Sequence, residues 1–343
     1  EEATPLANLD RIRPDFFAKG FEYGSSALPP ATQKEAEVVT GYGGQMIFTP
    51  GDVVYSSSKF LNLSLPQVQI EKLLWLMRNN DMDFNALRGI LARFEDFHVH
   101  VVGDTIIDSY TRTNFIGGQT KTPTFSVLYQ GQDDYIGGAG IVAQHLRAAG
   151  AKVTLSTVLG DDRLKEFVVE GMGDSGIELD AKIDPTRPTI NKNAIIAGGY
   201  RLLKIDTLDN RPVSEEILGE LARSVRESPA AAVVFSDFRH GIFNRMSVPL
   251  LTQAIPDEAF RVADSQVASR WGNITEFKGF DLITPNERES RFALGDQDST
   301  IGGLSRLLQE AADYNNIVLK LGERGIFCAT EDQEAKDTYF SVD

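Results

Sequence analysis

The sequence predicts an α/β protein with a mainly parallel, helix-covered sheet and a small β lid, preceded by part of a second α/β domain. Three observations support this. Short apolar strands alternate with helical patterns along most of the 343 residues, an acidic pair follows an apolar strand at 99–102, and glycine turns stand at two strand ends. Alternating strands and helices favour a parallel sheet, which binds ligands at the carboxyl ends of its strands.

Composition narrows the classes of function. The net charge of −15 and the pI of about 4.8 disfavour nucleic acids and anionic membranes as partners. A single cysteine, Cys328, leaves no internal disulfide and is typical of a reducing compartment, so we expect a cytoplasmic protein. No signal peptide is recognisable, and no apolar run approaches the roughly 20 residues of a membrane span. The chain opens on Glu1, and we expect a fragment truncated at both ends.

Three segments differ in their pattern. Residues 1–62 alternate helix and strand on a short period, as in the late units of an open parallel sheet. Residues 63–96 carry apolar residues at helical spacing and predict a helical linker, whereas 97–343 form a longer α/β domain. The strands expected there are 99–102, 124–130 in a lid, 153–158, a hairpin of 192–197 with 201–205, 231–236, 261–264, 281–284 and 316–321.

Acidic side chains gather at the ends of these strands. Asp104 and Asp108 follow the first strand, and Asp237 and Asp264 follow two later ones. A carboxylate accepts hydrogen bonds from neighbouring sugar hydroxyls, so such a set predicts a polyol clamp. Aspartate is also a common turn former, which is the more usual role for any one of the four alone. The set as a whole favours a binding site.

Two glycine turns frame the domain. Gly137-Gly138 precedes a helix at 139–149, where backbone can approach a ligand and free N–H groups favour an oxyanion. Gly322 and Gly325 either shape a turn under an adenine or phosphate or form a plain hairpin.

A strand that breaks at a proline supplies candidate magnesium residues. Asn286 and Glu289 follow Thr284-Pro285 and are a plausible outer-shell pair around magnesium and phosphate, with Glu289 acting through water. Magnesium keeps several waters and takes few protein ligands, so this small set is sufficient.

In this order the segments resemble the ribokinase-type (PfkB) family of carbohydrate kinases. They are most similar to the kinase half of bifunctional heptose-phosphate kinase/nucleotidyltransferases of the ADP-heptose synthase type, which act in lipopolysaccharide precursor synthesis. The resembling stretch runs from Val99 to the end. Its markers are Val102-Gly103-Asp104 with Asp108, Gly137-Gly138-Ala139, Pro188-Thr189-Ile190-Asn191-Lys192, Ser236-Asp237, Thr284-Pro285-Asn286 with Glu289, and Leu321-Gly322 with Gly325.

The resemblance implies a ribokinase-like fold and assigns roles to residues. The sugar-binding set would be Asp108, Gly137, Gly138, Thr189, Lys192 and Asp237. The set for ATP and Mg²⁺ would be Asn286, Glu289, Gly322 and Gly325. The ligands would be a sugar phosphate and a nucleotide, with no nucleic acid or membrane partner, and the assembly a homodimer. The family's Gly-Ala-Gly-Asp motif, which carries the base, is expected after Asp343, so we expect this chain to have little or no kinase activity.

Residues 1–62 resemble the C-terminal part of a cytidylyltransferase-like nucleotidyltransferase. That resemblance implies that Lys19 and the triplet Ser56, Ser57 and Ser58 touch nucleotide phosphates. We therefore expect a bifunctional parent enzyme that phosphorylates a sugar and activates a sugar phosphate as a nucleotide derivative. The domain order, transferase before kinase, is the reverse of that in the familiar bifunctional enzymes.

Three positions depart from the family pattern. Ile141 stands where a sugar-binding asparagine is usual, Gln266 where a lysine is usual, and Lys121 where heptose kinases have a glutamate. These changes keep two alternatives open. One is a non-catalytic binder of sugar or nucleotide with a kinase fold, and the other is a simple ribokinase- or fructokinase-like enzyme.

Overall fold

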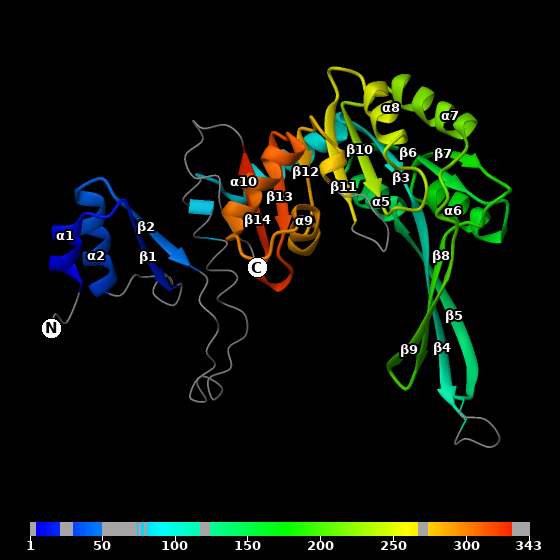
Figure 1. Ribbon diagram of the computed structural model, residues 1–343, viewed down its shortest axis with the longest axis horizontal. Helices are drawn as coiled ribbons and strands as arrows, with labels where there is room; N and C mark the ends of the chain where they lie inside the picture. Colours follow the sequence, from blue (N-terminus) through cyan, green and yellow to red (C-terminus); the bar gives the residue numbers. More distant parts are fainter. Residues whose placement is uncertain are drawn as a thin grey trace. The chain divides into compact units, whose positions relative to one another are not determined.

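The structure is a computed structural model, and it describes residues 5–20, 30–49, 74, 77–78, 81–116, 124–266 and 274–330. The chain divides into two compact units, Glu1–Ala86 and Leu87–Asp343, and each is described by itself (Figure 1).

The smaller unit contains one parallel strand pair with helices. Its elements are α1 (Leu6–Ile12), β1 (Phe16–Gly20), α2 (Pro30–Gly41) and β2 (Gln45–Thr49). β1 and β2 pair in parallel with α2 between them in sequence, which is the βαβ arrangement that the sequence predicted. Of the expected linker 63–96, the described part includes α4 (Phe84–Ala92) and the short helix η2 (Arg93–Asp96), so its last third is helical as predicted.

The larger unit is built on an eight-stranded sheet in the order β14-β13-β12-β11-β10-β3-β6-β7. Neighbouring strands are parallel except for the antiparallel pair β13 and β14. The strands are β3 (His98–Gly103), β6 (Lys152–Leu159), β7 (Glu178–Ile183), β10 (Ala232–Asp237), β11 (Phe260–Ser265), β12 (Leu282–Ile283), β13 (Asn316–Lys320) and β14 (Ile326–Thr330). The helices are α5 (Ala139–Ala148), α6 (Arg163–Asp174), α7 (Glu215–Arg226), α8 (Ser247–Ala254), α9 (Glu287–Leu294) and α10 (Ile301–Ala312), with short helices η3 (Ile274–Glu276) and η4 (Gly322–Arg324).

Helices cover both faces of this sheet. Successive residues of β3 enter two different apolar clusters: Val101 packs with residues of α5 and α6, whereas Val102 packs with residues of α7, α8 and α10. A parallel strand covered on both sides needs apolar residues on both, which explains why the successive residues Val101 and Val102 are both valine. The predicted mainly parallel, helix-covered sheet is confirmed.

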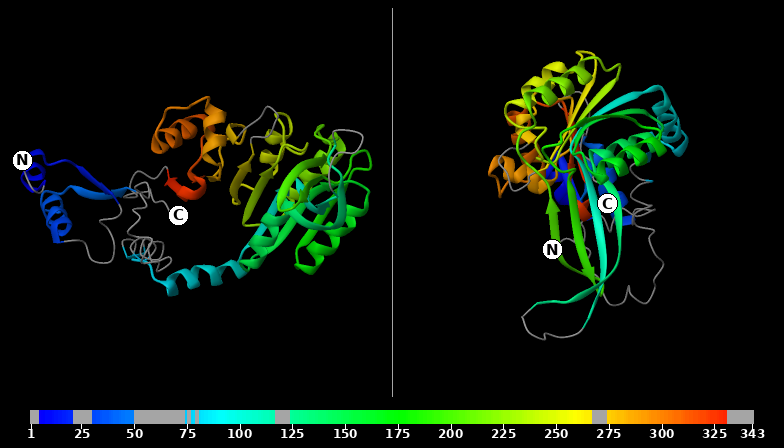
Figure 2. Two further views of the ribbon diagram at one scale, coloured as in Figure 1. Left: turned by 90° about the horizontal axis from the view of Figure 1, so that it is seen from below. Right: turned by 90° about the vertical axis from the view of Figure 1, so that its right-hand side faces the viewer.

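A separate four-stranded sheet forms the lid, in the order β5-β4-β8-β9. Its strands are β4 (Thr105–Phe115), β5 (Val127–Gly138), β8 (Asn191–Ala197) and β9 (Tyr200–Thr207). The hairpin β8–β9 turns at Gly198 and Gly199, both with positive φ, as the sequence indicated. The long strands of the lid leave the large sheet together (Figures 1 and 2).

The sequence interpretation missed β4 and therefore misplaced Asp108. It put Asp104 and Asp108 together in the loop after the first strand, whereas Asp108 lies inside β4 and is paired with Tyr135 of β5 and Lys192 of β8. The side of β4 that is buried is polar, with Ser109, Thr111 and Thr113, so an apolar period-2 signal is absent from the sequence.

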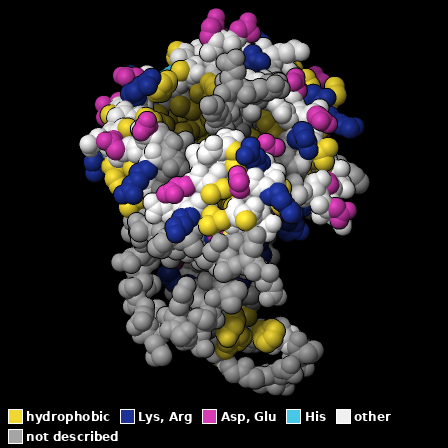
Figure 3. Space-filling view, turned by 90° about the vertical axis from the view of Figure 1, so that its left-hand side faces the viewer, with side chains coloured by type: hydrophobic (Ala, Val, Ile, Leu, Met, Phe, Trp, Pro, Cys, Tyr) yellow, Lys and Arg dark blue, Asp and Glu magenta, His cyan; other side chains and the backbone are white. Residues whose placement is uncertain are grey.

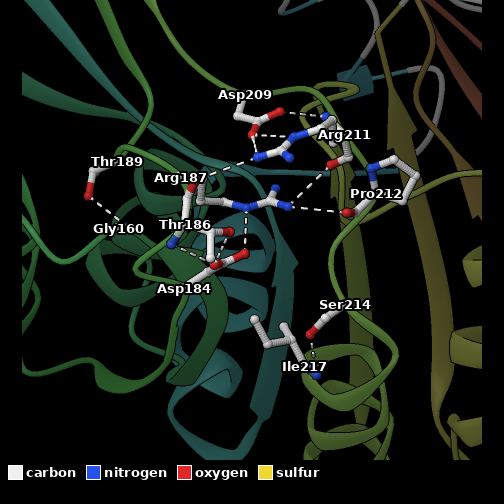
Figure 4. Close-up of polar contacts among 10 residues, drawn as sticks. All are labelled: Gly160, Asp184, Thr186, Arg187, Thr189, Asp209, Arg211, Pro212, Ser214 and Ile217. Atoms are coloured by element: carbon white, nitrogen blue, oxygen red, sulfur yellow. Dashed lines mark hydrogen bonds and ion pairs between the residues drawn. The ribbon is translucent and has the colours of Figure 1, made fainter.

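The chain crosses between the large sheet and the lid four times, at the connections β3–β4, β5–α5, β7–β8 and β9–α7. Hydrogen bonds join the last two of these crossings to each other. Arg187, between β7 and β8, donates from Nε to Asp184 Oδ2 (2.8 Å) and from Nη2 to the backbone oxygens of Arg211 (3.3 Å) and Pro212 (3.2 Å), between β9 and α7 (Figure 4). The Arg187 and Asp184 side chains are 7% and 8% exposed. A cavity of about 460 Å³ lined by both crossings lies beside this ion pair.

Replacing Arg187 by methionine should cost about 3 kcal/mol of unfolding free energy, because it leaves the Asp184 carboxylate buried without its cation. Urea denaturation followed by circular dichroism measures the loss. The matched control is Arg163→Met, since Arg163 is 80% exposed and 4.0 Å from its acidic partner, and this change should cost almost nothing. A loss below about 1 kcal/mol for Arg187→Met would show that the contact is not a fastening point.

Candidate active site

Asp108 lies on the open face of the lid, at its base. Along β4 the side chains alternate between buried and partly open positions, and Asp108 and Tyr110 are on the open side. A Cβ atom at Gly137 would overlap Oδ2 of Asp108, so only glycine lets the carboxylate take this position. The group that approaches Gly137 is thus a side chain of the protein, and the expected approach of a ligand to this backbone stays a prediction.

Lys192 is the register partner of Asp108 on β8 and shares its face of the lid. Its Nζ lies 6.0 Å from the centre of the Phe238 ring, which belongs to the loop after β10 of the large sheet. This face of the lid thus looks toward the strand ends of the sheet. Asp108, Gly137, Lys192 and Phe238 come from four segments and meet in one place.

Burial and mixed charge set the electrostatics here. Desolvation raises the pKa of Asp108, and the nearby ammonium groups of Lys192 and Lys204 oppose that rise. Desolvation also lowers the pKa of Lys192, and Lys204 lowers it further, whereas Asp206 and Asp108 act in the opposite direction. Lys204 and Asp206 are exposed and lie 3.7 Å apart. Two carboxylates and two ammonium groups therefore stand near one another on the lid, an arrangement suited to a ligand with several hydroxyls and an anionic group.

Gly138 makes the junction between lid and helix. Its φ of +59° is in the left-handed region, and a Cβ atom there would strike the backbone oxygen of Asp104. Helix α5 begins directly after it without a side-chain cap. Its first N–H, that of Ala139, donates to the Asp104 oxygen (2.9 Å), so the capacity to bind an oxyanion is left to the N–H groups that follow. The predicted strand-to-helix junction at Gly137-Gly138 is confirmed.

Two of the predicted sugar-binding residues are wholly buried. Asp237 accepts hydrogen bonds from Ser265 Oγ (2.8 Å) and the Arg239 backbone N–H (2.8 Å), and it forms an ion pair with the Arg239 side chain. Burial raises the pKa of Asp237 to about 7 although Arg239 opposes it. Thr189 accepts a hydrogen bond from Gly160 N–H (3.0 Å), and its own N–H donates to Asp162. In these contacts both residues hold loops around the site, and contact with sugar stays a prediction for each.

Asp104 has a structural role in this site. Its side chain accepts hydrogen bonds from the backbone N–H groups of Phe238 (3.0 Å) and His240 (3.1 Å), and its backbone oxygen accepts one from Ala139 (2.9 Å). It is 1% exposed, and desolvation raises its pKa. The sequence placed it with Asp108 in a polyol clamp, but Asp104 instead fixes the backbone around the clamp.

The candidate nucleotide side lies at the ends of β12 and β13. Asn286 caps α9: its side chain accepts a hydrogen bond from Glu289 N–H (2.8 Å), and Glu289 Oε2 accepts one from Asn286 N–H (2.7 Å). Glu289 is 7% exposed, and burial raises its pKa while the Asn286 N–H and Lys320 lower it. The pair predicted at the magnesium is thus a preformed capping box, in which Glu289 Oε1 takes no part.

The second glycine turn joins β13 to β14. Gly322 and Gly325 have φ of +64° and +82°, and Leu321 N–H donates to the Gly325 oxygen (2.8 Å). Arg324 in this turn forms an ion pair with Glu287, the first residue of α9. The turn joins two antiparallel strands and is tied to the start of α9, a geometry that both predicted alternatives allow, so its contact with a nucleotide stays a prediction.

The donor set fits a magnesium ion held mainly by water and phosphate. Among the described residues no group of three or more His, Cys, Asp or Glu side chains could hold a metal. One carboxylate oxygen in the first turn of α9, Glu289 Oε1, takes no part in the capping box, and magnesium bound with substrate phosphates needs only one or two carboxylates.

In the smaller unit, Lys19 donates to Thr32 Oγ1 (3.1 Å) and forms an ion pair with Glu35, whose side chain is 3% exposed. Its predicted contact with nucleotide phosphate would have to compete with this carboxylate. Ser56, Ser57 and Ser58 lie outside the described residues, as does Lys121.

Acidic and basic side chains are interspersed over the face drawn in Figure 3. Among the described helices, none is both long enough and apolar enough to cross a membrane.

Comparison with known proteins agrees with this arrangement. A bifunctional protein HldE of Pelobacter propionicus is 25% identical over 251 residues, which is 71% of this chain and 51% of that protein. The HldE of Trichlorobacter lovleyi is 28% identical over 267 residues, covering 72% and 51%. The chain thus spans about half the length of these relatives.

Solved structures show the same fold. Arabidopsis thaliana ribokinase, determined with ribose and ATP, has a TM-score of 0.53 at 18% identity, with 71% of this chain and 78% of that chain covered. Phosphofructokinase-2 of Escherichia coli, in a tetrameric inhibited form, has a TM-score of 0.55 at 15% identity, covering 69% and 78%.

The family model agrees with both comparisons, because the model of the pfkB family carbohydrate kinases matches residues 96–340, nearly all of the larger unit. With its lid, its parallel sheet and its two glycine junctions in the family's order, this chain belongs to the pfkB family of carbohydrate kinases.

Proposed function

We propose that this protein transfers the γ-phosphoryl group of ATP to a hydroxyl of a sugar or sugar phosphate, with a heptose-phosphate-like substrate as the leading candidate. The observation that carries the proposal is the Asp108 carboxylate, held over Gly137 and beside Lys192 on the open face of the lid. A partly desolvated carboxylate at this place accepts hydrogen bonds from vicinal hydroxyls and fixes the orientation of the sugar.

Phosphoryl transfer depends mainly on positioning and on neutralising charge. A new bond forms between the sugar oxygen and the γ-phosphorus, the bond to the β–γ bridging oxygen breaks, and ADP leaves. Asp108 orients the hydroxyl, and the N–H groups that follow Ala139 in the first turn of α5 bind the transferred phosphoryl. Gly322 and Gly325 shape the nucleotide pocket. Magnesium, when bound, neutralises phosphate charge, and Asn286 and Glu289 would hold it through water. The hydroxyl proton passes to a base, a role that we assign to none of the residues that the structure describes.

A phosphorylated sugar suits the charges at the lid better than a plain sugar does. Desolvation, and after it the nearby ammonium group of Lys204, lower the pKa of Lys192, and an anionic group on the sugar would favour the charged form of this lysine. This supports the heptose-phosphate-like substrate over a simple ribokinase- or fructokinase-like one.

We further propose that the parent protein couples this step to nucleotidyl transfer and so makes a nucleotide-activated sugar. The support is the parallel βαβ unit before residue 50, together with the similarity of this chain to bifunctional HldE proteins. Lys19 and the serine triplet would bind nucleotide phosphates there. We place the protein in the cytoplasm, consistent with its charge and single cysteine, and propose a homodimer acting on small molecules.

Asp108→Asn should lower kcat/KM for the sugar about 10- to 100-fold, because a hydrogen bond to a charged group is worth about 1.5–3 kcal/mol. We would determine kcat/KM from the rate of ADP release, with sugars and sugar 7-phosphates as substrates and the product of the complete reading frame as enzyme. The matched control is Asp133→Asn on the same lid, whose pair with Arg112 is largely exposed and worth little. Equal activity of wild type and Asp108→Asn would refute the assignment, and saturable sugar binding without any turnover would favour the non-catalytic binder.

Lys19→Ala should reduce pyrophosphate release from a nucleoside triphosphate and a sugar 1-phosphate at least about tenfold, since it removes a phosphate-binding cation. The same protein should keep its ADP release, whereas Asp108→Asn should show the reverse pattern. If Lys19→Ala changed neither activity, or both in parallel, Lys19 would be a structural partner of Glu35 alone.

A further inference from the structure

A lysine at the candidate nucleotide edge has no role in the account above. Lys320 is the last residue of β13, and its Nζ donates to Asp264 Oδ1 at 2.9 Å. The same oxygen accepts a hydrogen bond from Thr284 Oγ1 at 3.0 Å. The Lys320 side chain is 44% exposed, and Asp264 is 25% exposed. The ammonium group thus stands at the surface of the edge, held from one side.

The topology fixes which edge this is. β11, β12 and β13 are neighbouring parallel strands, so Asp264, Thr284 and Lys320 all stand at their carboxyl ends. Lys320 N–H donates to the Pro285 oxygen (2.9 Å), and Asn286 forms an isolated parallel bridge with Lys320. The lysine is therefore adjacent both to the capping box of α9 and to the turn at Gly322.

An ion pair with Asp264 does not use the whole capacity of this side chain. An ammonium group has three donors, and one of them goes to Asp264. A partly exposed pair of this kind stabilises a fold by about 0–1 kcal/mol, so fold stability alone gives little reason for it. Asp264 does, however, fix the direction of a long flexible side chain, and it leaves the other donors toward solvent at the edge where a nucleotide would lie.

We infer that Lys320 binds the polyphosphate of the nucleotide and that Asp264 is its positioning residue. This inference rests on the proposed function, because it takes the ligand of this edge to be a nucleoside triphosphate. Gln266, at the end of β11, supplies no positive charge where the sequence analysis noted a lysine in related kinases. Lys320 provides a cation at the same edge from a different strand.

The test is nucleotide binding by the 343-residue chain, which needs no turnover. Isothermal titration with ATP, ADP and adenosine, with magnesium present, compares wild type with Lys320→Met and Lys320→Arg. Lys320→Met should lower the affinity for ATP at least about tenfold and the affinity for adenosine less than about twofold, since a charge-assisted phosphate contact is lost. Lys320→Arg should keep ATP affinity within about threefold, because it keeps the charge. The control is Lys278→Met, which removes the same charge at an exposed lysine before the amino end of β12. It should change neither the affinity for ATP nor the affinity for adenosine.

Asp264→Asn separates the ion pair from the phosphate contact. It should lower ATP affinity by about threefold, less than Lys320→Met does, because the lysine keeps its charge but loses the carboxylate that fixes its direction. Two results would mean that the pair is purely structural and would overturn the inference. One is an equal loss of affinity for ATP and for adenosine in Lys320→Met. The other is a loss of ATP affinity in Asp264→Asn as large as that in Lys320→Met. Unchanged ATP affinity in Lys320→Met would also overturn it. If wild type bound neither ATP nor adenosine, the proposed function itself would fail, which is a distinguishable result.

Discussion

The geometry of the candidate active site depends on one buried carboxylate, that of Asp104. Its side chain holds the loop after β10 through two backbone N–H groups, and its backbone holds both the end of β10 and the start of α5. Two of the four chain crossings between lid and sheet, at Asp104 itself and at Gly138, are fixed by these contacts. Hydrogen bonds to a charged acceptor are worth about 1.5–3 kcal/mol each, enough to offset part of the cost of burying the charge.

The other two crossings are fixed by Arg187, and together the two devices set where the lid stands over the strand ends. Asp108 and Lys192 sit close to these fastened points, near the base of the lid. A carboxylate that orients a sugar must be held within a fraction of an ångström, and rigid supports on both sides of the lid provide that precision. The chemistry then requires that the nucleotide edge, formed by β12, β13 and α9, face the same space.

Much of this could be predicted from the sequence, for identifiable reasons. Apolar runs doubly covered by helices are conspicuous, so β3, β10 and β11 were expected at nearly their observed positions. The hairpin at Gly198-Gly199 and the junction at Gly137-Gly138 were predicted because glycine marks positive φ and close approach. β4 was missed because its buried side carries serine and threonine, so a test for apolar alternation fails. Its β-branched residues at 111 and 113 were the available signal.

Long-range contacts were beyond the sequence. Lys320 and Asp264 are 56 residues apart, and only the strand order brings them to one edge. Asp104 and Asp108 look equivalent in the sequence, but one is buried under backbone N–H groups and the other lies on the partly exposed side of β4, because a strand begins between them. Burial and partner identity, which decide whether a carboxylate binds ligand or backbone, follow from tertiary packing.

The central claim is that sugar and nucleotide occupy opposite sides of one space, at Asp108 and at the β12–β13 edge. A crystal structure of the protein with a sugar phosphate and a non-hydrolysable ATP analogue tests it most directly. The account predicts a sugar hydroxyl within hydrogen-bond distance of the Asp108 carboxylate and the polyphosphate beside Asn286 and Lys320. A sugar bound elsewhere, for example in the cavity beside Arg187 with Asp108 untouched, would contradict it.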